Sequence, residues 1–138
     1  MGKKVFQLPH ELKKLTDIVW PEIKNLLEIE IENFFKSGHK LIVVEAAVLL
    51  EANWQEGMNE TWVVFVPYEE AVKRAMQRDN QSMERVKNIL DSQISNKERI
   101  SKANVVISSL WERDYTIKQV KRAWNLLIDR TLKTNSKL

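Results

Sequence analysis

Three short, continuous runs of apolar residues divide the chain and predict buried strands. They are Leu41–Val44, Trp62–Val66 and Val105–Ile107, each rich in valine and isoleucine and none alternating with polar residues. Continuous apolar runs are typical of parallel strands that are covered on both faces. Helical patterns separate the runs, so the sequence predicts an α/β protein with a layered, parallel sheet.

Proline, glycine and apolar spacing locate the helices. Pro21 is expected in the first turn of a long helix and Gly38 just past its end, as the preferences of these residues predict. A shorter helix is expected at Ala46–Ala52, and another at Glu69–Arg78.

Capping signals locate three more helices. Ser82 is expected to cap one of them, and Ser95 with Glu98 fits the capping box S-x-x-E of a second. Thr116 and Gln119 fit the same motif at the start of the last helix, whose apolar residues recur at helical spacing.

Composition limits the class of protein. The chain has 138 residues, of which 43% are hydrophobic, and this predicts one domain covering residues 1–138. A net charge of +3 suits a small polyanionic ligand at least as well as a nucleic acid, and no nucleic-acid motif is present. The absence of cysteine excludes disulfides and thiolate metal sites.

Localisation follows from what the sequence lacks. No apolar run approaches the roughly 20 residues of a membrane helix, and the first ten residues do not form a signal peptide. We therefore expect a cytoplasmic protein without a membrane span, with mitochondrial association as the alternative.

Basic helices between the second and third apolar runs are typical of a lid that handles phosphate, expected at about residues 68–102. Arg74 and Arg78 are four residues apart and share one helix face. Guanidinium groups bind phosphate with paired donors and can neutralise charge during phosphoryl transfer. The alternative is a solvated helix face, with the arginines paired to Glu69, Glu70 or Asp79.

Glu45 ends the apolar run LIVVE, which fits the Walker B pattern. A carboxylate at the carboxyl end of a buried strand lies where open α/β sheets bind ligands, and it can hold Mg²⁺ directly or through water. The alternative is an acidic residue that serves solubility or helix capping.

No glycine-rich phosphate loop accompanies these residues. The three glycines are Gly2, Gly38 and Gly57, and none stands in a G-x-x-x-x-G-K-[ST] context. A lid without such a loop is the feature that any functional hypothesis has to accommodate.

Together the motifs resemble the dephospho-coenzyme A kinase family, and most of all the kinase domain of animal bifunctional coenzyme A synthases. The resemblance covers roughly residues 5–130. It is carried, in order, by the segments VFQLPHELKKLTDIVWPEI, VVEAAVLLE, VKRAMQRD, the Q-x-S of Gln93 and Ser95, the Ala103-Asn104 pair, and SSLWE.

The resemblance implies a P-loop kinase fold and a reaction in which ATP, with Mg²⁺, phosphorylates the ribose 3′-hydroxyl of dephospho-coenzyme A. It implies that Arg74 contacts phosphates during transfer. Arg78 would assist, and Arg99 stands where the family usually has lysine. Glu45 would lie near Mg²⁺.

In the family, the phosphate loop, the first strand and the acidic general base would precede Met1. We therefore expect a truncated fold that is inactive alone and has unpaired edges at Leu41–Val44 and Trp62–Val66. Three outcomes are then open: the two strands pair directly, a partner chain supplies the missing strand, or the isolated chain is poorly stable. We expect poor stability or tight self-association. The alternative function is a non-catalytic protein that binds coenzyme A or a partner.

Overall fold

The computed structural model describes residues 9–135, and residues 5–8 of the first motif quoted above lie outside this part. The chain divides into two compact units, one ending at Glu56 and the other beginning at Gly57. In the described part, no helix combines the length and the apolar character needed to cross a membrane.

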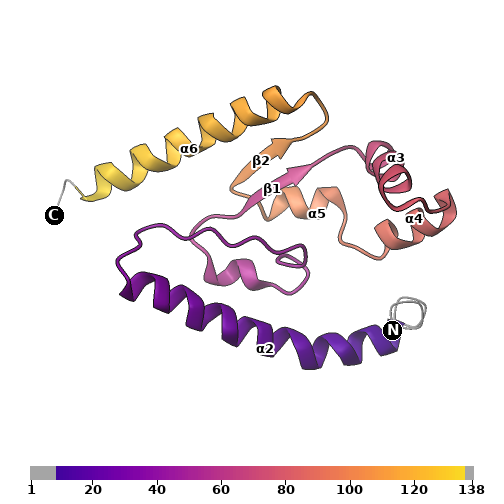
Figure 1. Ribbon diagram of the computed structural model, residues 1–138, viewed down its shortest axis with the longest axis horizontal. Helices are drawn as coiled ribbons and strands as arrows, with labels where there is room; N and C mark the ends of the chain where they lie inside the picture. The colour runs from indigo at the N-terminus through magenta and orange to yellow at the C-terminus, as the bar shows by residue number, and fades with distance from the viewer. Residues whose placement is uncertain (1–8, 136–138) are drawn as a thin grey trace. The chain divides into compact units, whose positions relative to one another are not determined.

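One long helix, α2 (Pro9–Lys36), dominates the first unit (Figure 1). Pro21 lies inside α2, so the prediction that the helix begins there is wrong. A proline within a helix removes one backbone donor, yet α2 continues on both sides of Pro21. Pro9 takes the position in the first turn that was expected for Pro21.

The predicted end of this helix is confirmed at Gly38, whose φ of 92° is left-handed. The Gly38 N–H donates to the Phe35 carbonyl, and the His39 N–H donates to the Phe34 carbonyl, both at 3.0 Å. This pair of bonds is a Schellman motif, which satisfies the last carbonyls of the helix.

The apolar run Leu41–Val44 does not form a strand, and this prediction is wrong. Residues 41–46 have no regular secondary structure. A strand needs a hydrogen-bonded neighbour, and the sheet in the described residues contains two strands from the second unit only. Direct pairing of Leu41–Val44 with the second apolar run, one of the three expected outcomes, is therefore not observed.

The helix predicted at Ala46–Ala52 is also wrong. Residues 47–53 form turns, and the short 3₁₀ helix η1 (Trp54–Gly57) follows them. Asn53, with a left-handed φ of 55°, ends these turns just before η1 begins. Trp54, the first residue of η1, is buried.

A parallel pair of strands forms the centre of the second unit: β1 (Trp62–Phe65) and β2 (Val105–Ser108) lie side by side in Figure 1. Trp62 lies opposite Val105, and the register continues to the pair Phe65 and Ser108. The second and third predicted strands and their parallel direction are confirmed.

Side chains of the sheet are covered unevenly. Val63 and Ile107 are 7% and 3% exposed, whereas Val64 and Val106 are 58% and 40% exposed. The complete coverage of both faces that the apolar runs predict is therefore absent from the described residues.

Three helices connect β1 to β2, as the helical signals of this segment predict: α3 (Tyr68–Asp79), α4 (Met83–Asp91) and α5 (Asn96–Ser101). The Ser82 hydroxyl accepts from the Arg85 N–H at the start of α4. The Ser95 hydroxyl accepts from the Glu98 N–H at 3.2 Å at the start of α5. Both predicted N-caps are therefore present.

Packing between these helices rests on a few small side chains. Val72 of α3 is 3% exposed and Val86 of α4 is 2% exposed. The Tyr68 hydroxyl also donates to Asp91 at 2.8 Å, which joins the start of α3 to the end of α4. This bond raises the pKa of Tyr68, because the carboxylate accepts only from the protonated phenol.

The last helix, α6 (Arg113–Asn135), begins three residues before the predicted start at Thr116. Thr116 and Gln119 do not form a capping box. Their side chains bond instead to Ser108 at the end of β2: Thr116 Oγ1 donates to the Ser108 carbonyl at 3.3 Å, and the Gln119 amide donates to the same oxygen at 2.8 Å. Gln119 Oε1 also accepts from the Ser108 N–H at 3.1 Å.

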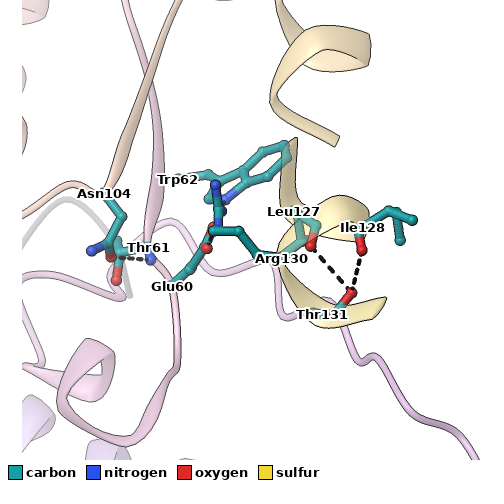
Figure 2. A network of polar contacts seen from close by, with 8 residues as sticks. All are labelled: Glu60, Thr61, Trp62, Asn104, Leu127, Ile128, Arg130 and Thr131. Atoms are coloured by element: carbon teal, nitrogen blue, oxygen red, sulfur yellow. Dashed lines mark hydrogen bonds and ion pairs between the residues drawn. The ribbon is translucent and has the colours of Figure 1, made fainter. Parts of the chain in front are cut away.

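Polar contacts fix the amino end of the sheet, as Figure 2 shows. Asn104 Oδ1 accepts from the backbone N–H of the buried Thr61 at 2.8 Å. Glu60 accepts from the Trp62 indole N–H at 2.9 Å and forms an ion pair with Arg130 of α6. The indole bond, with Arg130 adding to it, holds the pKa of Glu60 below its ordinary value.

Candidate functional site

The candidate site lies at the carboxyl ends of β1 and β2. From there the chain continues through Val66 and Pro67 into α3, and through Ser109 and Leu110 towards α6. Ligands of open α/β sheets bind at this edge, outside the carboxyl ends of parallel strands. We therefore expect the arginines that bind phosphate to lie at this edge.

Arg74 reaches this edge from α3. Its Nη1 donates to the Ser109 carbonyl at 2.8 Å and its Nη2 to the Leu110 carbonyl at 3.3 Å. Its Nε donates to Glu70 Oε1 at 2.7 Å. The guanidinium is thus held beside the connection that follows β2, and 43% of the Arg74 side chain remains exposed.

Glu70 therefore pairs with Arg74, as the alternative interpretation of this helix face expected. The ion pair with Glu70 does not prevent Arg74 from reaching the end of the sheet. Glu70 lies one helical turn before Arg74 and binds its Nε, while the terminal nitrogens bind the connection after β2. The Ser109 and Leu110 carbonyls are partners that no local sequence signal predicts, since they lie 35 and 36 residues from Arg74.

Arg78 shares the helix but not the partners of Arg74. Its Nε and Nη2 donate to the two carboxylate oxygens of Asp79 at 2.7 and 2.8 Å, and 78% of its side chain is exposed. This two-point bond raises the pKa of Arg78 and lowers that of Asp79. Among the described contacts, Arg78 makes none with the sheet edge.

Arg99 lies in the last turn of α5, and its Nη2 donates to Gln93 Oε1 at 2.8 Å. Gln93 is the first residue of the Q-x-S motif, so the motif and the arginine are neighbours in space. Asn96, the first residue of α5, donates from its side chain to the Val66 carbonyl at 2.8 Å, which places the start of α5 at the end of β1.

Asn96 and Ser109 are residues at this edge that the sequence interpretation did not select. Ser95 correctly predicted where α5 begins. The position of Asn96 directly after this cap is the sequence feature that could have identified it. Ser109 had only its place in SSLWE as a signal.

Glu45 belongs to the first unit, at the end of residues 41–46, and its side chain is exposed. Within the described residues, no three histidine, aspartate or glutamate side chains come together in a way that could hold a metal ion. Mg²⁺ typically uses one or two carboxylates together with substrate phosphates. A single carboxylate fits that use, and Glu45 as a Mg²⁺ ligand stays a prediction.

Comparison with known proteins gives one consistent family. The profile of the dephospho-CoA kinase family matches residues 1–111. A dephospho-CoA kinase of Dehalococcoides mccartyi is 33% identical over 79% of this chain and 55% of its own length. One from Listeria innocua is 30% identical over 87% of this chain and 60% of its own length.

Solved structures agree with these relatives. A Thermus thermophilus protein matches with a TM-score of 0.69 and 26% identity, covering 94% of this chain and 64% of its own. The dephospho-CoA kinase from Campylobacter jejuni matches with a TM-score of 0.60 and 29% identity, covering 91% of this chain and 62% of its own. The chain thus spans a little over half to nearly two-thirds of the length of the proteins it matches.

Proposed function

The chain belongs to the dephospho-CoA kinase family, and we propose that it acts as the lid and acceptor side of a kinase that transfers phosphate from ATP to the ribose 3′-hydroxyl of dephospho-CoA. The observation that supports this most directly is the position of Arg74, which is held at the carboxyl ends of the two parallel strands. The predicted likeness to the animal bifunctional enzymes stays a prediction.

Arg74 is the proposed catalytic and phosphate-binding residue. Phosphoryl transfer depends mainly on positioning and on neutralising the charge of the transferred group. A guanidinium held by backbone carbonyls meets both needs, since it keeps its charge at any working pH. Arg78 and Arg99 are proposed as further phosphate ligands, and Glu45 as the carboxylate that would hold Mg²⁺ with the phosphates of ATP.

We also propose that these 138 residues do not catalyse the reaction alone. The sequence contains no G-x-x-x-x-G-K-[ST] loop, whose backbone amides and lysine cradle the phosphates of ATP in such kinases. Losing one preorganised donor costs about a hundredfold or more in rate. Binding of the acceptor should survive better than turnover, because the lid residues are present.

Two assays test this proposal. Calorimetry should show that dephospho-CoA binds and that Arg74→Gln weakens the binding, while Arg113→Gln, on the exposed start of α6, should not. A coupled assay with ATP, Mg²⁺ and dephospho-CoA should show no turnover by this chain. Turnover above background would refute the proposed inactivity, and failure of dephospho-CoA to bind would refute the acceptor-side role.

The edges of the sheet support a further proposal, association with another chain or a second copy. At the β2 edge, the Gln119 amide occupies the backbone groups of Ser108. On the side of β1 that faces β2, the Thr61 carbonyl accepts from the Val105 N–H and the Phe65 carbonyl from the Ser109 N–H. Successive residues of a strand direct their backbone N–H and C=O groups to opposite sides. The backbone groups of Trp62 and Val64 therefore point away from β2.

In the described part of the chain no strand pairs with this side of β1. Unprotected strand edges promote association with other strands. Light scattering over a range of concentrations should show self-association that Val64→Lys reduces and Val43→Lys, at an exposed position outside the sheet, leaves unchanged. A monomer at all concentrations would refute self-association.

A further inference from the structure

The donors of Arg74 are only partly used. A guanidinium has five N–H donors. Three are engaged in the described part of the chain, by Glu70, Ser109 and Leu110, with one bond on each nitrogen. One N–H therefore remains on each of the two terminal nitrogens, and the side chain is 43% exposed. Unused guanidinium donors of this kind suit the oxygens of phosphate groups.

Glu70 contributes the only charged partner that Arg74 has in the described residues. Its carboxylate is more enclosed than the arginine, with 26% of the side chain exposed, and the bond to Nε is short at 2.7 Å. Nε is the nitrogen that carries a single donor, so this bond fixes the plane of the guanidinium without using the terminal nitrogens. The two carbonyls then define its rotation within that plane.

We propose that Glu70 is a positioning residue for phosphate recognition by Arg74: it holds the guanidinium plane so that the unused terminal donors are available to the oxyanion groups of the ligand. This inference rests on the proposed function, because it takes dephospho-CoA as the ligand. It also opposes a simpler electrostatic expectation, in which a carboxylate beside an arginine weakens anion binding by cancelling charge.

The two expectations differ in sign, so substitutions at one position separate them. Glu70→Ala removes both the charge and the acceptor, and Glu70→Gln removes the charge but keeps an oxygen that can accept from Nε. If Glu70 only cancelled charge, both variants would bind dephospho-CoA more tightly. If it positions Arg74, Glu70→Ala binds more weakly and Glu70→Gln retains much of the affinity.

Glu69 provides the matched control. It lies in the same first turn of α3, carries the same charge and is exposed, but its side chain has no ion pair in the described residues. Glu69→Ala therefore changes the net charge and the helix turn as Glu70→Ala does, without touching the guanidinium of Arg74.

The experiment measures dephospho-CoA binding by calorimetry on the full chain and its variants, with circular dichroism confirming that each variant folds. We expect Glu70→Ala to weaken binding about two- to fivefold, the upper part of the range for a partly exposed ion pair, and Glu69→Ala to change it less than twofold. In an Arg74→Gln background, Glu70→Ala should have no further effect.

A second readout concerns the free protein. The Arg74 Nε–H signal in ¹⁵N NMR should exchange slowly with water and should exchange faster in Glu70→Ala. Unchanged Nε–H exchange, or tighter binding by both Glu70 variants, would overturn the positioning role. Weaker binding by Arg74→Gln without an effect of Glu70→Ala would overturn this inference and leave the proposed function standing. Absence of dephospho-CoA binding by the unaltered chain would overturn both.

Discussion

Replacing Gln119 with leucine should open the outer edge of β2. The substitution removes the two bonds between the Gln119 amide and the backbone of Ser108, of 3.1 and 2.8 Å. The Ser108 carbonyl keeps Thr116 Oγ1 as a partner at 3.3 Å, whereas its N–H loses the side-chain acceptor. With about 1 kcal/mol for a net hydrogen bond and partial access of water to the half-buried N–H, the local opening free energy should fall by about 1–2 kcal/mol.

Amide hydrogen exchange measures this loss at the residue concerned. The chain consists of two compact units, so a single unfolding transition would not isolate β2, whereas the Ser108 amide reports on it directly. A loss of about 1–2 kcal/mol corresponds to exchange about 5- to 30-fold faster. The control is Gln77→Leu, the same substitution at an exposed position of α3.

Two results would refute the reasoning. Equal Ser108 exchange in Gln119→Leu and Gln77→Leu would mean that the amide does not protect the strand. Faster exchange throughout the second unit would mean that Gln119 supports packing of α6 as a whole rather than the edge of β2.

Three further predictions concern α4, α5 and the amino end of the sheet. Val86→Ala should cost about 1–3 kcal/mol of stability in the second unit by removing buried methyl groups, and urea unfolding should show a smaller loss for the exposed Val64→Ala. Ser95→Ala should cost about 1 kcal/mol at the start of α5, seen as faster exchange of the Glu98 amide. Glu60 has a lowered pKa, so its contribution to stability is present above the unfolded pKa and is lost as the pH falls through the folded pKa. Glu60→Gln should therefore be less stable near pH 7, and acid titrations of the two proteins should converge as the pH falls below the folded pKa of Glu60.

Local signals in the sequence were sufficient to predict the starts of α4 and α5 and the end of α2. Ser82 and Ser95 cap helices because a hydroxyl can accept from an N–H three residues later, whatever the rest of the chain does. Gly38 ends α2 for a similarly local reason, since glycine adopts a positive φ without strain. Elements whose cause lies within a few residues were predicted correctly.

Elements that depend on distant partners were predicted less well. Leu41–Val44 has the composition of a buried strand, yet composition cannot supply the neighbour that a ladder requires, and the segment is not a strand. The prediction that the long helix begins at Pro21 was wrong, because a proline can lie inside a long helix at the cost of a backbone hydrogen bond without ending it. Gln119 matched a capping motif, but the end of β2 offered its amide better partners.

The two arginines of α3 show why spacing alone could not rank the candidate site residues. Arg74 and Arg78 are equivalent by helical periodicity, but Arg78 is bound to the adjacent Asp79 and remains largely exposed. Such a surface pair exchanges readily with water or with a ligand phosphate. Arg74 is bound to the Ser109 and Leu110 carbonyls, and these can move only if the connection after β2 moves with them. If phosphate binds at this edge as proposed, it meets Arg74 already in place, whereas Arg78 has to leave Asp79 first. Substitution of Arg74 should therefore weaken dephospho-CoA binding more than substitution of Arg78, as calorimetry would measure.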